Sequence, residues 1–297
     1  MPGEFDFIEW IRSQQRPSHL VNTGVGDDLA VLKWPKDDLL IAGVDQVLDG
    51  VHFDSKMHPP RAIGRKVMNR NLSDCAAMAS LPAAAVATVA LPRGVGHDYA
   101  KQLFLGMKEA GEVFDCAIVG GDTGSWDGKL VMTVTILGRS AGVQPVLRSG
   151  AKAGDGIYVS GPLGGSILGR HMTFSPRVDL GRELAKRGDA AAMIDLSDGL
   201  SRDLRHICRL SGNLGAVVYA DRVPIHDDAQ AAFRLDHVSP LDHALNDGED
   251  YELLYTCRNV ATMGIYIGDI SSAPGIWLQH ADGKREPLEP KAWEHLL

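Results

Sequence analysis

The stretch Ala191-Ala192-Met193-Ile194-Asp195-Leu196-Ser197-Asp198-Gly199 places two carboxylates directly after an apolar strand pattern. Residues 199–211 continue with a helical pattern, so these acids lie where a strand ends and a helix begins. Ligands of open α/β sheets bind in the crevice beyond such strand ends. The stretch therefore predicts an α/β fold with a ligand site next to Asp195 and Asp198.

Acidic residues recur in similar positions throughout the first half. They occur in Gly26-Asp27-Asp28, Val44-Asp45, Ser73-Asp74 and Gly120-Gly121-Asp122. Converging carboxylates repel one another unless cations hold them, and hard oxygen ligands without clustered Cys or His select Mg²⁺ or Ca²⁺ over Zn²⁺. Mg²⁺ usually shares its shell with water and substrate phosphates. The pattern predicts a phosphate-handling site organised by several Mg²⁺ ions.

Composition and net charge exclude several kinds of binding partner. The chain has 297 residues, 44% hydrophobic and 23% charged, with a formal net charge of −8. This charge argues against nucleic-acid and anionic-membrane partners, which require a basic face, but not against a nucleotide bound through Mg²⁺. We see no secretory signal or membrane-spanning run, and the four cysteines are far apart, so we expect a cytoplasmic protein.

Strand and helix patterns alternate in both halves, which predicts two domains, residues 1–146 and 147–297. Residues 30–32 and 39–44 are expected to form paired strands, and a helix is expected after Gly164-Gly165. The other expected helices are 5–15, 61–80, 97–114 and 199–211, and the other expected strands are 83–91, 116–119, 130–138, 157–160, 191–194, 216–219, 251–257 and 264–270.

Each motif also has a simpler interpretation. The chain contains no Walker A motif, because neither Gly128-Lys129 nor Gly283-Lys284 has the required glycine and hydroxyl residues. Asp27-Asp28 fits a solvated turn, Asp74 a buried hydrogen bond to a helix end, and Gly120–Thr123 a hairpin into strand 130–138. Ser197 or Asp198 can cap the following helix, Arg148 can be a surface residue, and Gly248-Glu249-Asp250 can be a solvated loop.

Taken together and in order, these segments resemble the thiamine-monophosphate kinase family of the PurM-like (AIR synthase-related) superfamily. Nearly the whole chain takes part, and the combination is specific although no single motif is. The resemblance rests further on Gly3-Glu4-Phe5, Gly50-Val51-His52-Phe53, Asn71-Leu72-Ser73-Asp74, Arg148-Ser149-Gly150-Ala151, Pro176-Arg177-Val178 and Gly248-Glu249-Asp250-Tyr251.

The resemblance implies direct transfer of the ATP γ-phosphoryl group to thiamine monophosphate, yielding thiamine diphosphate and ADP. It also implies a homodimer whose N-terminal domains build a β-barrel across the interface, each followed by a C-terminal α/β domain. By match, the metal ligands are Asp28, Asp45, Asp74, Asp122, Asp195 and Asp198, and the ATP contacts are Gly121, Asp122, Arg148 and Ser197. The contacts to thiamine phosphate are His52, Glu249, Asp250 and Trp293, and Asp122, Asp198 and Arg148 are the expected catalytic residues.

Three features depart from the family pattern. Gly43-Val44 stands where hydroxyl residues are common, so a metal site is lost or other oxygen atoms fill it. Asn69-Arg70 replaces small apolar residues and adds charge near the proposed metals, and the segment between Cys257 and Gly264 is short. Two alternatives stay open: a sister activity such as AIR synthase or a HypE-like enzyme, and a nucleotide or thiamine-phosphate binding protein without turnover.

Overall fold

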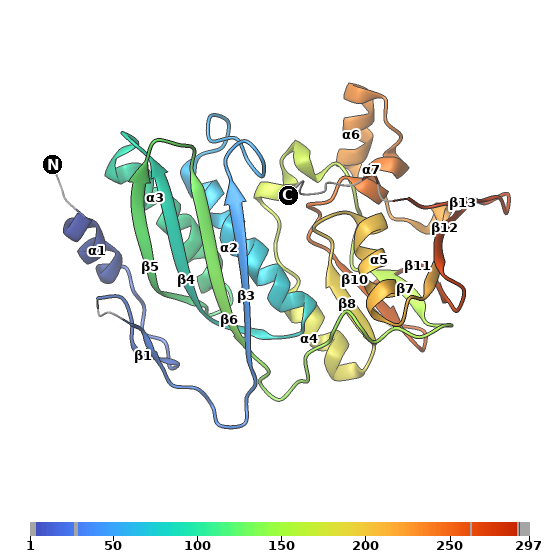
Figure 1. Cartoon of the computed structure of the whole chain (residues 1–297), viewed down its shortest axis with the longest axis horizontal. Coiled ribbons are helices and arrows are strands. Elements are labelled where there is room, and N and C mark those ends of the chain that lie inside the picture. The colour runs from blue at the N-terminus through green and yellow to red at the C-terminus, as the bar shows by residue number, and fades with distance from the viewer. Residues whose placement is uncertain (1–3, 27–28, 262, 290, 292–297) are drawn as a thin grey trace. The chain divides into compact units, whose positions relative to one another are not determined.

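Long apolar strands and amphipathic helices alternate along the chain and form two structural units (Figure 1). The computed structural model of the chain describes residues 4–26, 29–261, 263–289 and 291. Unit 1 comprises Met1–Cys75 and Ser80–Gly142, and unit 2 comprises Ala76–Ala79 and Val143–Leu297. The α/β class expected from the sequence is confirmed.

A four-stranded sheet in the order β3-β6-β4-β5 forms the centre of unit 1. Residues Met132, Val134 and Ile136 alternate along β6 and are all at most 2% exposed, because this face of the sheet packs on the helices (Figure 1). The elements of unit 1 are α1 (Glu4–Ser13), β1 (Val21–Thr23), β2 (Val31–Leu32), β3 (Leu40–Leu48), α2 (Pro60–Ala77, whose last residues belong to unit 2), β4 (Leu81–Pro92), α3 (Gly96–Glu112), β5 (Ala117–Trp126) and β6 (Val131–Arg139).

Strand pairing in unit 1 differs from two expectations. Residues 30–32 and 39–44 do not pair with each other: β2 pairs with β1, and β3 pairs antiparallel with β6. The possible hairpin from Gly120 into the next strand is also absent, because β4 lies between β5 and β6 and pairs with both. Local pattern identified these strands, but long-range pairing selected their partners.

Unit 2 contains a seven-stranded sheet in the order β13-β12-β9-β11-β7-β10-β8, with β12 and β9 parallel and the other neighbours antiparallel. Leu204 and Ile207 of α5 lie in one apolar core with Ile157, Ile194 and Leu254 of the sheet. The elements are β7 (Gly156–Val159), η1 (Ser166–Leu168), η2 (Arg170–Met172), α4 (Val178–Arg187), β8 (Ala192–Asp195), α5 (Leu200–Leu210), β9 (Gly215–Tyr219), η3 (Ala220–Arg222), α6 (Asp227–Asp236), α7 (Pro240–Asn246), β10 (Leu253–Cys257), β11 (Ile265–Ser271), β12 (Gly275–Gln279) and β13 (Arg285–Pro287).

The helix expected after Gly164-Gly165 is replaced by two short 3₁₀ helices, η1 and η2. Gly164, Gly165 and Gly169 all have positive φ, which interrupts an α-helix. A Cβ atom on Gly165 would lie 2.3 Å from the backbone of Asp228, so this close approach requires glycine. Among the described residues, no helix is both long and apolar enough to cross a membrane.

Helices α2 and α3 touch at two glycines that face each other's backbone. A Cβ on Gly64 would lie 2.0 Å from the carbonyl oxygen of Leu103, and a Cβ on Gly106 would lie 2.0 Å from that of Arg61. Real Cβ atoms do not approach backbone atoms this closely, so the helices must separate if either glycine gains a side chain.

We expect Gly64→Ala and Gly106→Ala each to lower the free energy of unfolding by about 2 kcal/mol, although alanine is the better helix former. Urea unfolding followed by circular dichroism measures this change. Gly124→Ala is the control, because a Cβ on Gly124 meets nothing within 4 Å. Equal stability of the Gly64→Ala, Gly106→Ala and Gly124→Ala variants would show that the helices do not cross here.

Candidate active site

The acidic turn of unit 2, residues 195–199, connects β8 to α5. Asp195 is the last residue of β8 and is only 4% exposed. Leu196 donates its N–H to the carbonyl oxygen of Glu252 (2.8 Å), which extends the pairing with β10 by one residue. Gly199 has φ +100°, and α5 begins at the next residue. The turn thus presents Ser197 and Asp198, both half-buried, at the strand end, as the sequence predicted.

A second acidic segment, residues 247–251, is hydrogen-bonded to this turn. Glu249 donates its N–H to the carbonyl oxygen of Ser197 (2.8 Å), and Tyr251 donates to that of Leu196 (2.9 Å). Glu249 and Tyr251 both have φ +53°, a left-handed conformation that is uncommon for these residue types. Backbone strain of this kind often occurs at functional sites. Two motifs that were predicted separately therefore lie side by side.

Asp203 and His206 of α5 complete a cluster with Asp198 that sequence reasoning missed. Ligand atoms of these three side chains lie within 4.8 Å of one another. Asp203 is 1% exposed and accepts the N–H of Asp198 (3.1 Å). The available signal was an acid within an apolar stripe, since Leu200, Asp203, Leu204 and Ile207 share one helix face.

Charges around the cluster perturb its titration. Burial, and then the charges of Asp198 and Asp195, raise the pKa of Asp203 well above its usual value. The positive charge of Arg148 acts to lower the pKa of Asp203, so the guanidinium group lies close enough to interact with this cluster. Burial and Arg148 both lower the pKa of His206, which favours the neutral imidazole. A cation placed among these groups would relieve the repulsion between the carboxylates.

The residues of this cluster fit Mg²⁺ by the chemistry of their donor atoms. Carboxylate oxygens of Asp198 and Asp203 are hard ligands, and Ser197 adds a hydroxyl group in the same turn. Within the described ranges, this is the one group of three or more acidic, His or Cys side chains whose ligand atoms all lie within 4.8 Å of one another. The negative charge of Asp195 also raises the pKa of Asp203, which indicates that Asp195 lies at the edge of the cluster.

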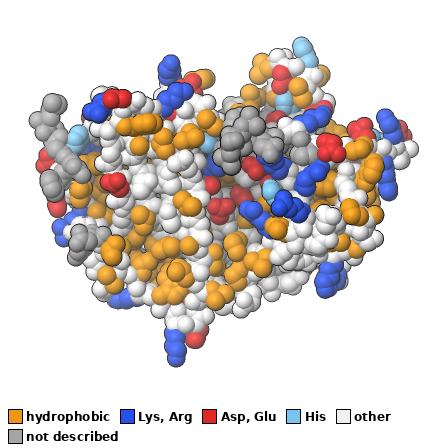
Figure 2. Space-filling model, viewed as in Figure 1, with side chains coloured by type: hydrophobic (Ala, Val, Ile, Leu, Met, Phe, Trp, Pro, Cys, Tyr) orange, Lys and Arg blue, Asp and Glu red, His pale blue; other side chains and the backbone are white. Residues whose placement is uncertain are grey.

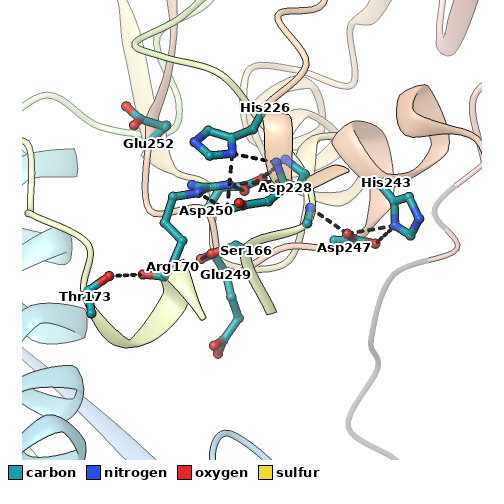
Figure 3. A network of polar contacts seen from close by, with 12 residues as sticks. Ser166, Arg170, Thr173, His226, Asp228, His243, Asp247, Glu249, Asp250 and Glu252 are labelled. Carbon is teal, nitrogen blue, oxygen red and sulfur yellow. Dashed lines mark hydrogen bonds and ion pairs between the residues drawn. The ribbon is translucent and has the colours of Figure 1, made fainter. Parts of the chain in front are cut away.

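Asp250 lies in the polar network of Figure 3. Its carboxylate accepts the N–H of Gly164 (3.0 Å) and a hydrogen bond from Arg170 Nη2 (2.9 Å). Arg170 also donates to Asp228 (3.1 Å), and Asp247 accepts the N–H of Gly165 (2.8 Å). Asp250 is 3% exposed, and burial raises its pKa to about 7 although Arg170 acts to lower it. These contacts hold the glycine segment 164–169 in place.

Glu249 points away from Arg170 and Asp250 in the same view (Figure 3). Its carboxylate lies 3.1 Å from His171 Nδ1 and accepts a hydrogen bond from the Tyr251 hydroxyl (3.2 Å). Tyr251 in turn stacks on Phe174, with ring centroids 3.9 Å apart. Of the two acids predicted to bind substrate, Glu249 is the more accessible to a ligand.

The predicted residues of unit 1 lie on three elements. Asp45 of β3 accepts a hydrogen bond from Arg70 Nε of α2 (3.1 Å). Asp74 of α2 faces the same strand, because a Cβ on Gly43 would lie 3.8 Å from its Oδ2 atom. Asp122 lies on β5, where it is exposed and pairs with Thr88. Asp28 and Trp293 lie outside the described residues.

Glycine is also required beside Asp122, since a Cβ on Gly121 would lie 1.9 Å from the carbonyl oxygen of Ala87. His52 lies in the turn after β3, where its Nδ1 atom accepts the N–H of Leu48 (3.1 Å). The fully buried Lys66 donates to the carbonyl oxygen of His52 (2.6 Å), which fixes this turn on α2. These contacts fix Gly121 against β4 and His52 in the turn beside α2.

We expect Arg170→Met to lower the free energy of unfolding by about 3 kcal/mol at pH 8, because it leaves Asp250 buried without its cation. The pKa of Asp250 in the folded state lies above its unfolded value of about 3.9, so stability from this group falls as pH rises between these values. Removing Arg170 raises the pKa of Asp250 in the folded state further. At pH 5 this carboxyl group is mostly protonated with or without Arg170, so the substitution must cost less stability at pH 5 than at pH 8.

Urea unfolding at pH 5 and pH 8 measures both losses. Arg187→Met is the matched control, because the side chains of Arg187 and its partner Glu183 are 49% and 40% exposed, far more than that of Asp250. It should change stability by less than about 0.5 kcal/mol at either pH. A pH-independent loss for Arg170→Met would mean that Asp250 does not titrate as described.

Comparisons with known proteins identify the family. The model of "AIR synthase related protein, N-terminal domain" matches residues 26–140. A thiamine-monophosphate kinase of Rhodopirellula baltica is 37% identical over 98% of this chain and 97% of its own length. The crystal structure of thiamine-monophosphate kinase from Stenotrophomonas maltophilia superposes with a TM-score of 0.81 at 31% identity, covering 95% of this chain and 97% of that one.

A solved structure of AaThiL complexed with AMPPCP and TMP has a TM-score of 0.78 at 29% identity, covering 99% of this chain and 97% of that one. Structures of HypE are only 17% to 19% identical, so they show a shared fold alone. The full-length similarity at 37% identity shows that the chain belongs to the thiamine-monophosphate kinase family.

Proposed function

We propose that the protein transfers the γ-phosphoryl group of ATP to thiamine monophosphate and releases thiamine diphosphate and ADP. The observation that carries this proposal is the similarity, over almost the whole chain, to thiamine-monophosphate kinases and to a structure that holds AMPPCP and TMP. The sequence identity to HypE is only 18%, against 29% to 37% for the thiamine-monophosphate kinases, so the kinase is favoured over this sister activity.

The residues of the site suit this reaction electrostatically. Two phosphorylated molecules repel each other, so catalysis consists mainly of charge neutralisation and in-line positioning. Bound Mg²⁺ would supply the neutralising charge. In unit 2 the proposed ligands are Asp195 and Asp198, with Asp203 beside them. In unit 1 the residues matched to metal ligands are Asp28, Asp74 and Asp122. The acceptor phosphate is ionised near neutral pH, so the site needs little general-base catalysis.

Other groups of the chain bind and orient the two substrates. Arg148 and the hydroxyl of Ser197 would contact ATP phosphates beside the acidic turn. In unit 1, Gly121 is the residue matched to an ATP contact. His52, Glu249 and Trp293 would contact thiamine monophosphate. Asp250 holds segment 164–169 through Gly164 and Arg170, and Ser166 of this segment donates to the carbonyl oxygen of Glu249 (2.6 Å). The absence of hydroxyl groups at Gly43 and Val44 leaves the ligands of unit 2 unchanged.

We further propose a homodimer that forms through the sheet of unit 1. Leu40 and Val44 of β3 are 59% and 60% exposed, and Val44 pairs with Thr135 on the face opposite to the buried residues of β6. Figure 2 shows hydrophobic side chains spread over this side of unit 1. Exposed apolar surface on a sheet is typical of a protein–protein interface.

A direct assay tests the kinase. Protein, ATP, Mg²⁺ and thiamine monophosphate should yield equal amounts of ADP and thiamine diphosphate, measured by chromatography, and EDTA should stop the reaction. We expect Asp198→Asn to lower kcat by at least about 100-fold, as is common when an electrostatic stabiliser is removed. Asp221→Asn is the control, since Asp221 is an exposed acid of the same unit. ADP formation without thiamine diphosphate would contradict the proposed acceptor.

A second experiment tests the dimer. Light scattering coupled to size exclusion should give the mass of two chains for the wild type, and Val44→Asp should shift it to one chain, because a buried unpaired carboxylate opposes association. Val113→Asp is the control, since Val113 is 72% exposed at the end of α3. A monomeric wild type, or a Val44→Asp dimer, would exclude this interface.

A further inference from the structure

Gly43, Asp45 and Asp74 share one region of unit 1. Gly43 and Asp45 are two residues apart on β3 and pair with Ile136 and Val134, which are both buried. Their side-chain positions therefore lie on the face of the sheet that packs on the helices. The Cβ position of Gly43 is 3.8 Å from Asp74 Oδ2, so a hydroxyl side chain at residue 43 would point toward this carboxylate.

Val44 does not contribute to this region. Its side chain lies on the opposite face of β3 and is 60% exposed. Of Gly43 and Val44, residue 43 is therefore the one where a side-chain oxygen would lie next to Asp74. Glycine supplies no such oxygen beside this proposed metal ligand.

A fixed cation lies in the same region. Arg70 precedes Asp74 by one helical turn, and its Nε atom donates to Asp45 Oδ2 (3.1 Å). The Arg70 side chain is only 13% exposed and that of Asp45 is 31% exposed, so solvent screens the pair weakly. A guanidinium group stays protonated at every accessible pH. Asp45 consequently has a permanent positive partner within its own chain.

We propose that Arg70 replaces a divalent cation at Asp45, so that this protein binds one metal ion fewer than it would with a neutral residue at position 70. The inference rests on the proposed Mg²⁺-dependent function. Two independent features support it: glycine at position 43 supplies no side-chain oxygen next to Asp74, and the Arg70 guanidinium pairs with the Asp45 carboxylate. A divalent ion on the Asp45 carboxylate would lie next to the guanidinium, and the two positive charges would repel each other.

Counting bound ions tests this replacement. Mn²⁺ alone, titrated into the protein and followed by electron paramagnetic resonance of the free ion, gives the number of sites. We expect the wild type and Asp45→Asn to bind the same number, and Arg70→Gln to bind one more. Asp45→Asn combined with Arg70→Gln should return the number to that of the wild type, and Arg70→Lys should keep it unchanged.

Loss of one ion in Asp45→Asn would overturn the proposal, because Asp45 would then hold metal beside Arg70. An unchanged number in Arg70→Gln would overturn it as well. Circular dichroism verifies the fold of each variant, and Arg70→Ala is the second neutral variant if the glutamine variant unfolds. The count uses neither ATP nor thiamine monophosphate, so failure of the kinase assay and failure of this proposal are separate results.

Discussion

Repulsion among partly buried carboxylates is the physical constraint on which the proposed site depends. Asp195 and Asp203 are nearly inaccessible to solvent, and Asp198 lies close enough to raise the pKa of Asp203 further. Carboxylates in such surroundings require cations or protons. The chain supplies Arg148 near the acidic turn and Arg170 at Asp250, but the cluster of Asp198, Asp203 and His206 retains a donor set suited to Mg²⁺.

Glycine and left-handed backbone hold this charge cluster in place. Gly248 approaches the carbonyl oxygen of Ser197 so closely that its Cβ would lie 2.6 Å away, and Glu249 and Tyr251 adopt φ +53° on either side of Asp250. Hydrogen bonds from Glu249 and Tyr251 to the acidic turn compensate for this strain. The two acidic segments are thereby fixed as one unit, which limits the reorganisation needed when anionic substrates bind.

Sequence patterns predicted local secondary structure but missed strand pairings and side-chain contacts between separate elements. The strand end at Asp195 and the start of α5 followed from the apolar stretch and from the helical pattern of residues 199–211, and the alternation of strand and helix patterns indicated the α/β class. The pairing of β3 with β6, the Arg70–Asp45 ion pair and the contact of Asp198 with Asp203 connect separate elements or turns, so periodicity could not predict them. The expected helix after Gly164 did not form because Gly164, Gly165 and Gly169 have positive φ, a backbone conformation that the sequence pattern did not reveal.

A crystal structure with Mn²⁺ and AMPPCP would show whether metal binds at the acidic turn, because the anomalous scattering of Mn²⁺ locates each ion. We expect an anomalous peak about 2.1 to 2.2 Å from a carboxylate oxygen of Asp198, with a phosphate oxygen in the same coordination shell. If AMPPCP is bound and every Mn²⁺ peak lies far from Asp195, Asp198 and Asp203, metal binding at the acidic turn is contradicted.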